Sequence, residues 1–194
     1  PKMGITGQGR LNILYMAEAQ GANEDDQGRQ LVGDAGQVLR GELDKSGIDF
    51  DRDFYALNAV RCFTWKEGKK GRVSRNPTDQ EIRYCWKGTW DLVRELKPKA
   101  IILAGLVPLQ SYLLDKGQDK PTMAKWRSWA IPDQELGCWI IPTYHPSYIL
   151  RNSHNKALGN LFRKDLQKAV QLNPEYEPLV RSHIEKARRI LPQQ

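Results

Sequence analysis

The chain has 194 residues, a length that fits a single domain with a sizeable hydrophobic core. Hydrophobic residues make up 40% of it, with six Trp and seven Tyr, which excludes an extensively disordered chain, and no apolar run approaches the roughly 20 residues of a membrane-spanning helix. The formal net charge of +7, from 30 basic and 23 acidic side chains, favours a polyanionic partner such as nucleic acid.

The first half of the chain predicts alternating strands and helices. A short apolar run at 12–16 indicates a buried strand, and residues 33–46 predict an amphipathic helix that ends before a glycine. Residues 54–60 predict the next strand. After a basic loop, Thr78 is followed three residues later by Glu81, which is the pattern of a capping box and predicts the start of a helix.

The second half continues the alternation. The segment KPKAIILAG, residues 97–105, contains the clearest apolar strand, and residues 106–114 predict a short helix after it. A fourth strand is expected at 138–141, followed by an amphipathic helix at 156–172. A last helix is expected on the surface at 176–190.

Strands that alternate with helices predict an α/β fold with a mainly parallel sheet. The strands are continuous apolar runs, so we expect helices on both faces of a four-stranded central sheet, a three-layer α/β/α arrangement. One domain would span residues 1–194, with a basic insertion loop at about 63–77 and a helical extension at about 175–194.

Polar or glycine residues stand where the predicted strands end. Glu18 comes just past the first strand, Asn58 closes the second, Gly105 ends the third and His145 follows the fourth. Ligands of such sheets bind beyond the carboxyl ends of the strands, so we expect these residues on one rim. A carboxylate and an imidazole there could form an acid–base pair.

Other chemistries have less support. Two candidate metal ligands with no third nearby make a poor zinc site. The chain contains no G-x-S-x-G motif of a serine nucleophile and no G-x-x-x-x-G-K motif of a phosphate-binding loop. Structural interpretations also stay open: Glu18 as an acid near a helix start, Asn58 as a strand-end cap, and His145 as a turn residue beside a proline.

Four segments occur in a specific order along the chain: AEAQGANEDDQGRQLVGDAG (17–36), LNAVRC (57–62), KPKAIILAG (97–105) and PTYHPSYILR (142–151). Together they resemble the uracil-DNA glycosylase superfamily, and most of all its iron–sulfur branch, family 4. The resemblance implies a monofunctional enzyme that flips a pyrimidine out of DNA and hydrolyses its N-glycosidic bond, leaving an abasic site. It also implies DNA as the partner, base-excision repair as the role and a monomer as the expected state.

The resemblance implies a role for each motif residue. Glu18 would position or activate the attacking water, Asn58 would read the Watson–Crick edge of the base, and His145 would donate a hydrogen bond to O2 of the leaving base. The remaining base-binding residues would be Ala19, Gln20, Gly21 and Leu31.

Further residues are expected to contact DNA. In the superfamily the loop after the His-Pro pair supplies an apolar wedge, for which Tyr148, Ile149 and Leu150 are the candidates here, with Arg151 on a phosphate. The other expected DNA-binding residues are Gly105, Ser147, Lys69, Lys70 and Arg72.

The sequence departs from the family pattern at the base pocket. Gln20 stands where the family usually has Pro, and Leu31 stands where a Phe is expected to stack on uracil. A leucine has no flat face, so a bulkier modified pyrimidine, excised from viral DNA in a defence role, is an alternative substrate. A catalytically inactive DNA-binding or sensor module is the other alternative. The basic loop contains no histidine, so we expect no covalent trapping of DNA.

The cysteines bear on a cofactor and on the cellular compartment. Cys62 and Cys85 correspond to the last two of four ligands of a [4Fe-4S] cluster in the resembled branch. The first two would lie upstream of Pro1, and the alternative is that this protein has lost the cluster. Two thiolates cannot hold such a cluster by themselves. Cys138 lies in a predicted strand and indicates a core residue. An odd, low cysteine count suits a reducing compartment, so we expect a cytoplasmic, DNA-associated protein.

Overall fold

The computed structural model describes residues 2–69, 71–118 and 120–172, so Lys70 and the expected helix at 176–190 lie outside the described residues. The central sheet has five strands in the order β2-β1-β5-β7-β6. Four of them run parallel, and the short edge strand β6 is antiparallel to β7. Their bounds are β1 Ile13–Ala19, β2 Phe54–Val60, β5 Ala100–Ala104, β6 Ile131–Asp133 and β7 Cys138–Thr143.

The α/β class and the four parallel strands agree with the sequence-based prediction. Strand β6 adds a fifth, antiparallel strand at the edge; it has three residues and includes Pro132, which an edge position tolerates. The predicted end of β1 is wrong, because the strand continues past Met16 to Ala19. Glu18 therefore lies inside β1, where its backbone conformation is fixed by the sheet.

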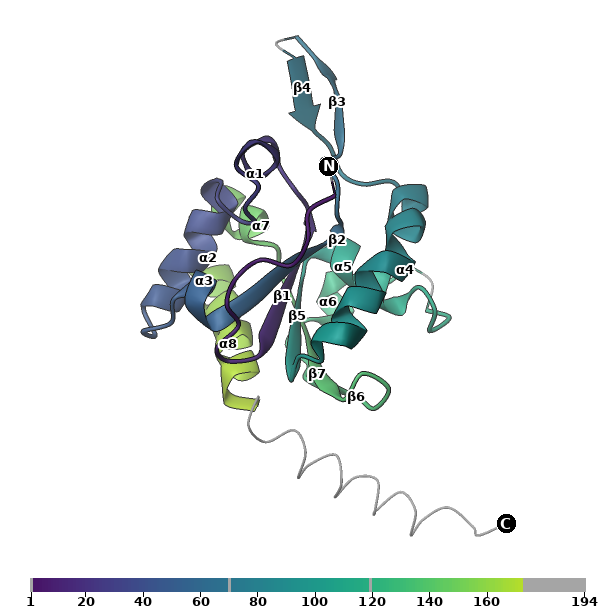
Figure 1. Ribbon diagram of the computed structural model, residues 1–194. Coiled ribbons are helices and arrows are strands. Elements are labelled where there is room, and N and C mark those ends of the chain that lie inside the picture. Colours follow the sequence, from purple (N-terminus) through teal and green to yellow (C-terminus); the bar gives the residue numbers. More distant parts are fainter. Residues whose placement is uncertain (1, 70, 119, 173–194) are drawn as a thin grey trace, which may run out of the picture.

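Helices cover both faces of the sheet and complete three layers (Figure 1). One face carries α2 (Asp34–Asp44), α3 (Phe50–Asp53), α7 (Pro146–Arg151) and α8 (Lys156–Leu172). The other carries α4 (Asp79–Leu96), α5 (Leu106–Leu113) and α6 (Met123–Trp126). Helix α1 (Ala22–Gln27) follows β1 directly. Within the described ranges, no helix has both the length and the apolar content to cross a membrane.

Strand β1 shows why two hydrophobic cores form. Ile13 and Tyr15 point to the core on the α2 and α8 side, whereas Leu14 and Met16 point to the core on the α4 and α5 side. All four are 0% exposed. Because side chains alternate along a strand, a central parallel strand must be apolar at every position, and this is what produces its uninterrupted apolar run.

The predicted capping box at the start of α4 is confirmed. The Glu81 backbone N–H donates to the Thr78 hydroxyl at 3.2 Å, and the Thr78 backbone N–H donates to the Glu81 carboxylate at 2.8 Å. The Arg75 guanidinium donates to both oxygens of the same carboxylate and, with these bonds, lowers the pKa of Glu81 to about 2. The segment before α4 is therefore tied to the helix start.

The basic segment predicted as an insertion loop at about 63–77 contains two paired strands. It forms an antiparallel hairpin of β3 (Trp65–Gly68) and β4 (Gly71–Ser74), which stands clear of the three layers (Figure 1). Its turn uses Gly71 with a φ of +105°, a conformation that L side chains rarely adopt. The sequence signal for a hairpin was present in the two glycines that flank the turn, although the basic composition obscured it.

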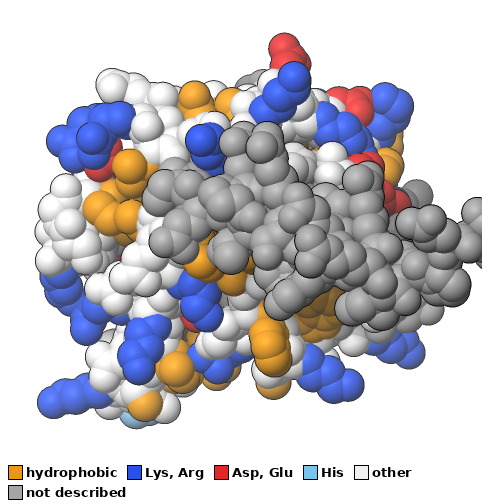
Figure 2. All heavy atoms as spheres, turned by 90° about the horizontal axis from the view of Figure 1, so that it is seen from below, with side chains coloured by type: hydrophobic (Ala, Val, Ile, Leu, Met, Phe, Trp, Pro, Cys, Tyr) orange, Lys and Arg blue, Asp and Glu red, His pale blue; other side chains and the backbone are white. Residues whose placement is uncertain are grey.

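Positive charge is not confined to the hairpin. The face seen from below carries Lys and Arg side chains in several separate groups, with a few acidic side chains among them (Figure 2). The net charge of +7 therefore does not by itself locate a nucleic-acid site.

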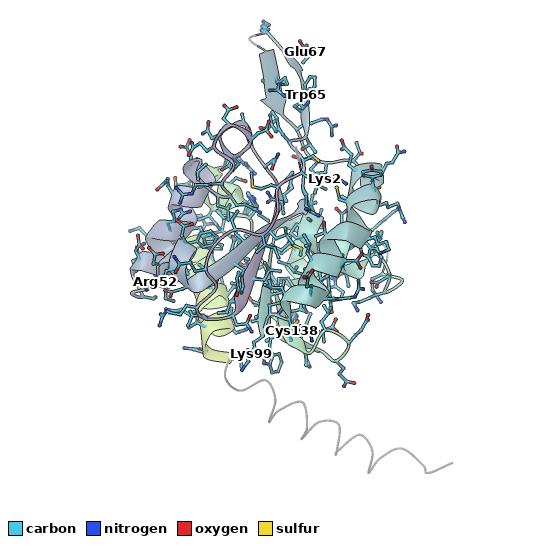
Figure 3. The ribbon with its side chains drawn as sticks, viewed as in Figure 1. Lys2, Arg52, Trp65, Glu67, Lys99 and Cys138 are labelled. Atoms are coloured by element: carbon cyan, nitrogen blue, oxygen red, sulfur yellow. The ribbon has the colours of Figure 1, made fainter. Side chains whose placement is uncertain are left out.

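A buried carboxylate connects the first residues of the fold to α3. The Asp53 side chain is 0% exposed and accepts hydrogen bonds from Arg52, at 2.8 and 2.9 Å, and from Arg10 at 2.6 Å. The Asp49 backbone N–H also donates to it at 3.0 Å. These bonds hold the pKa of Asp53 well below its usual range. Arg52 lies at the left side of the three layers, away from Trp65 on the hairpin above them (Figure 3).

We expect Asp53→Asn to lower the free energy of unfolding by about 1–3 kcal/mol at pH 7, because buried donors lose a charged acceptor. Asp53 has a lowered folded-state pKa, so its contribution is present above the unfolded pKa of about 3.9 and is lost as the pH falls. Urea unfolding at pH 7 and below pH 4 measures both effects. The exposed carboxylate in Asp91→Asn serves as the control, and an equal loss in both variants would contradict the assignment.

Candidate active site

Two adjoining cavities open at the carboxyl ends of the parallel strands. The first, hereafter the Asn58 cavity, has a volume of about 420 Å³, and the second, hereafter the Glu18 cavity, about 520 Å³. Ala19, His145 and Ser147 line both. The Asn58 cavity is also lined by Ala17, Gly21, Ala22, Asn23, Glu24, Leu31, Gly33, Asp34, Ala35, Asn58 and Ser74. The Glu18 cavity is also lined by Glu18, Asn76, Gly105, Leu106, Met123, Ala124, Tyr144, Tyr148 and Arg151.

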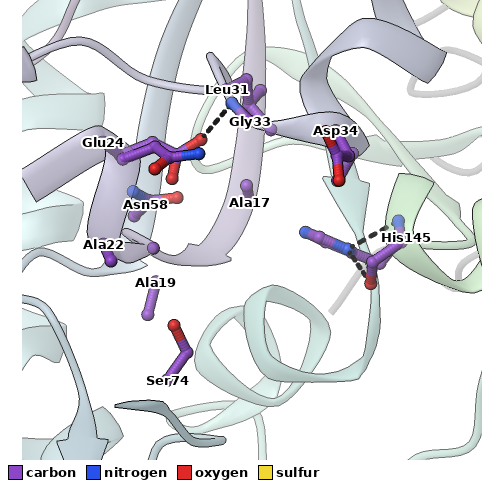
Figure 4. Close-up of a pocket in the computed structure, with 14 residues that line it drawn as sticks. Ala17, Ala19, Ala22, Glu24, Leu31, Gly33, Asp34, Asn58, Ser74 and His145 are labelled. Carbon is purple, nitrogen blue, oxygen red and sulfur yellow. Dashed lines mark hydrogen bonds between the residues drawn. The ribbon is translucent and has the colours of Figure 1, made fainter. Parts of the chain in front are cut away.

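The structure thus brings together four residues that the sequence places at strand ends. Asn58 and His145 approach the Asn58 cavity from opposite sides, with Ala17 between them (Figure 4). Glu18, adjacent to Ala17 in β1, lines the other cavity together with Gly105. His145 lines both, together with Ala19 and Ser147, and its imidazole is the one titratable group among these three shared residues.

The first turn of α7 determines which nitrogen of His145 carries the proton. His145 is the N-cap of α7, and its Nδ1 accepts a hydrogen bond from the Ser147 backbone N–H at 3.2 Å. The Ser147 hydroxyl lies 2.8 Å from the same nitrogen. A backbone N–H can only donate, so Nδ1 has no proton and the neutral ring carries its proton on Nε2.

Burial determines the charge of the same ring. Desolvation, together with the smaller effect of the positive charge of Arg151, lowers the pKa of His145 to about 4. At neutral pH the ring is uncharged. It therefore offers an Nε2–H donor but no positive charge.

Gly105 allows the turn after β5 to approach His145. Its φ is +100°, and its backbone N–H donates to the Thr143 carbonyl at 2.8 Å. A Cβ atom at this position would lie 3.1 Å from the Cβ of His145. A side chain here would be strained at this φ and would crowd the Cβ atom of His145, so backbone geometry and space both favour glycine.

Glu18 is partly buried beside a cation. Burial raises the pKa of its carboxyl group, and Arg151, at the end of α7 in the same cavity, opposes that shift. The two effects leave a carboxylate in a partly desolvated cavity with a compensating charge nearby. Electrostatic interactions are stronger there than in bulk water.

Glu24 is a residue that sequence reasoning missed. Its Oε1 accepts hydrogen bonds from the backbone N–H groups of Val32, at 3.0 Å, and Gly33, at 2.8 Å. These bonds hold the loop that presents Leu31, which is 8% exposed and has a φ of +56°. The run of acids and glycines predicted a tight loop, but which acid folds back on the backbone depends on the tertiary structure.

Gly36 brings helix α2 against the same loop. A Cβ atom at Gly36 would lie 1.8 Å from the Leu31 carbonyl oxygen, a distance that no side chain could tolerate. The wall of the Asn58 cavity at Leu31 is therefore defined by backbone contacts from two directions.

Some predicted residues lie away from the cavities. Gln20 is 3% exposed, lines neither cavity and donates from its side-chain amide to Asp25 Oδ1 at 2.8 Å. Ile149 is 7% exposed and packs in the core, so its side chain does not lie on the surface with its two neighbours. Its neighbours Tyr148 and Leu150 are 39% and 40% exposed.

The hairpin reaches the mouths of both cavities at its base. Ser74 lines the Asn58 cavity and Asn76 lines the Glu18 cavity. Lys69 and Arg72 are exposed further out on the hairpin, and Lys70 is not among the described residues.

Cys62 and Cys85 line a separate cavity of about 480 Å³ beside the start of α4. The first residues of the chain run past it, since the Met3 backbone N–H donates to the Arg61 carbonyl at 2.8 Å. Within the described part of the chain, no group of three His, Cys, Asp or Glu side chains could hold a metal ion. The two thiols line the same cavity, and a four-thiolate site would need two more. Cys138, 0% exposed in β7, is a core residue as predicted.

A family model supplies the deciding comparison: residues 5–171 match the model of the uracil DNA glycosylase superfamily. The chain belongs to the uracil-DNA glycosylase superfamily. The motif resemblance identified from the sequence is thereby confirmed, and the matched range includes the whole described sheet.

Curated relatives have the same name, "Type-4 uracil-DNA glycosylase". The protein of Thermotoga maritima is 33% identical over 167 residues, covering 85% of this chain and 80% of the relative. That of Pyrobaculum aerophilum is 29% identical over 169 residues, covering 85% and 81%. That of Sulfurisphaera tokodaii is 27% identical over 175 residues, covering 87% and 74%.

We expect His145 to remain neutral and protonated on Nε2 down to a pH of about 4, because the ring is buried and its Nδ1 accepts a backbone N–H. Side-chain ¹⁵N and ¹H NMR of the ¹⁵N-histidine-labelled protein, titrated from pH 8 to pH 4, measures the tautomer and the pKa. The exposed His154 provides the reference signal of a solvent-accessible ring. Titration of His145 near the ordinary histidine value of about 6.5, or an Nδ1–H signal for His145, would contradict the described environment.

Proposed function

We propose that the protein is a DNA N-glycosylase that hydrolyses the N-glycosidic bond of uracil in DNA and leaves an abasic site. The observation that carries this proposal is the sharing of His145 by two cavities, one containing the Asn58 amide and the other the Glu18 carboxylate. Superfamily membership supports the enzyme class, and the names of the relatives support uracil as the base.

The Asn58 cavity would hold the extruded base. The Asn58 side chain can donate and accept hydrogen bonds at once, which matches the adjacent O4 and N3–H of uracil. Leu31 would form an apolar wall beside the ring, and Gly21 would leave space for the nucleotide backbone. Extrusion of the base costs a few kcal/mol, which contacts in the cavity must offset.

His145 would stabilise the leaving base. As the glycosidic bond breaks, negative charge develops on the base, and the Nε2–H of a neutral imidazole can donate a hydrogen bond to O2. A preorganised donor aimed at developing charge lowers the activation free energy by about 3–4 kcal/mol. With a pKa of about 4 the ring stays neutral, with its proton on Nε2, throughout the neutral pH range.

Glu18 would act on the sugar side. The sugar develops positive charge as in other glycoside hydrolyses, and a carboxylate there can offset the charge and position the attacking water. The nearby cation of Arg151 favours the ionised form of Glu18. Among the described residues that line the two cavities there is no lysine, which supports hydrolysis by water over a Schiff-base reaction with strand cleavage.

The rim of α7 would meet the DNA duplex. Tyr148 and Leu150 are exposed beside the Glu18 cavity and would fill the gap that the extruded nucleotide leaves. Arg151 would neutralise a phosphate on the same side. These contacts require one copy of the chain, so we expect a monomer that acts on DNA in base-excision repair in the cytoplasm.

Cys62 and Cys85 would supply two thiolates to a [4Fe-4S] cluster, and the remaining two would have to come from outside the 194 residues. The cavity that Cys62 and Cys85 line lies beside the start of α4. It shares no lining residue with the Asn58 cavity or the Glu18 cavity. A cluster would therefore support the fold beside the hairpin and take no part in the bond cleavage.

We expect His145→Ala and Glu18→Gln each to lower single-turnover release of uracil by about 100-fold or more, because each removes a group that interacts with developing charge. Alkali cleavage of a labelled uracil-containing oligonucleotide measures the release. His154→Ala and Glu135→Gln, both exposed residues away from the cavities, should retain wild-type rates.

Binding of the same oligonucleotide separates the enzyme from a DNA-binding or sensor module. We expect the affinities of His145→Ala and Glu18→Gln to stay near the wild-type value, because the phosphate contacts are intact. A wild-type protein that binds DNA and releases no base of any kind would establish the inactive module instead.

A bulkier modified pyrimidine is the second candidate substrate, because Leu31 presents an aliphatic wall in place of a flat ring. We expect Leu31→Phe to lower the KM for uracil-containing DNA by about 5-fold or more, since stacking on an aromatic ring contributes about 1–3 kcal/mol per base. Leu31→Met, which keeps an aliphatic wall, is the control. Release of 5-substituted pyrimidines in preference to uracil by the wild type, abolished in Leu31→Phe, would favour a defence enzyme.

A further inference from the structure

The two faces of the β3–β4 hairpin differ in chemistry. Residues directly opposite each other share a face, so Trp65 and Ser74, with Glu67 and Arg72, occupy one face. The pair of Lys66 and Val73 points to the other face. The hairpin therefore has one face with an aromatic ring and a guanidinium, and another with a lysine and a valine.

Trp65 and Arg72 form an exposed surface that combines an aromatic ring with a cation. The Arg72 guanidinium carbon lies 5.6 Å from the Trp65 ring centroid and 5.7 Å from that of Phe63. Trp65 is 41% exposed, although an indole ring of this size is normally more buried in a monomer. An exposed tryptophan with an arginine beside it is the kind of surface on which nucleobases stack.

This surface is continuous with the candidate active site. Ser74, opposite Trp65 on the same hairpin face, lines the Asn58 cavity and appears at its edge in Figure 4. The base of the hairpin is fixed, since the Arg75 backbone N–H donates to the Thr64 carbonyl at 3.0 Å. The ion pair of Arg75 with Glu81 also ties this base to α4. Trp65 therefore has a defined position relative to the cavity.

We propose that Trp65 and Arg72 form a stacking platform for the base of a nucleotide next to the extruded one. The proposal rests on the proposed function, because that function puts a nucleotide in the Asn58 cavity. An adjacent nucleotide of the same DNA strand would then lie at the edge of this cavity, near Ser74. The described side chains of the hairpin carry more positive than negative charge, with Lys66, Lys69 and Arg72 against Glu67, which suits a phosphate backbone.

The two faces allow stacking to be separated from general attraction to phosphates. Arg72 and Lys66 are on the same hairpin and have the same charge, but only Arg72 lies on the tryptophan face. Attraction to phosphate alone predicts similar losses in Arg72→Gln and Lys66→Gln. A stacking platform predicts a larger loss in Arg72→Gln and the largest in Trp65→Ala.

The test measures binding to a single-stranded oligonucleotide containing 2′-fluoro-deoxyuridine, which resists hydrolysis. We expect Trp65→Ala to raise the Kd by about 5- to 100-fold, the range of one lost base stack, and Trp65→Phe to stay near wild type. Trp129→Ala, which removes an exposed tryptophan outside both cavities, should bind as the wild type does.

A second substrate identifies the stacked base. An oligonucleotide with an abasic analogue on one side of the 2′-fluoro-deoxyuridine, and a second with it on the other side, are compared with the intact strand. For one of the two abasic strands, the Kd of the wild type should rise by the factor that Trp65→Ala causes with the intact strand. The Kd of Trp65→Ala should be the same for that abasic strand and for the intact strand. Additive losses on both sides, or equal affinities for Trp65→Ala and the wild type, would overturn the platform.

Release of uracil from an ordinary deoxyuridine strand by the wild type, measured with the same protein, tests the proposed function separately. Release together with unchanged binding by Trp65→Ala removes the platform and leaves the enzyme in place. Wild-type protein that neither binds the strand nor releases a base overturns the proposed function and the platform with it.

Discussion

The arrangement of the rim depends on one hydrogen bond, from the Ser147 backbone N–H to Nδ1 of His145 at the first turn of α7. Because a backbone amide can only donate, this bond decides the tautomer, and burial decides the charge by lowering the pKa of the ring to about 4. Gly105 affects the position of His145, since a side chain at Gly105 would crowd the Cβ atom of His145. The two cavities are arranged on either side of the group that these three constraints hold.

The alternation of side chains along β1 separates the two halves of the proposed chemistry. Ala17 lines the Asn58 cavity, and Glu18, the next residue, lines the Glu18 cavity. A breaking glycosidic bond develops negative charge on the base and positive charge on the sugar. Ala17 and Glu18 point to opposite faces of β1, so the Glu18 carboxylate lies next to the Asn58 cavity but does not line it.

Specific contacts hold the Leu31 loop and the hairpin beside the two cavities. Glu24 binds the amides of Val32 and Gly33, and Gly36 lies against the Leu31 carbonyl. At the base of the hairpin, the Arg75 backbone N–H donates to the Thr64 carbonyl, and the Arg75 side chain forms an ion pair with Glu81. Neither set of contacts involves the side chains of Leu31 or Trp65, so the backbone that presents these side chains is fixed by other residues.

The sequence alone determined the α/β class, the four parallel strands, the capping box at Thr78 and the superfamily, because apolar periodicity, caps and linear motifs depend on residues close together in the chain. Only the tertiary structure decided that β1 extends through Glu18, that Glu24 folds back on the Leu31 loop, and that Gln20 and Ile149 turn away from the cavities. It also decided that Glu18 and Asn58 occupy different cavities joined by His145. These features depend on packing between segments distant in sequence, and no local pattern specifies which side chain fills a shared space.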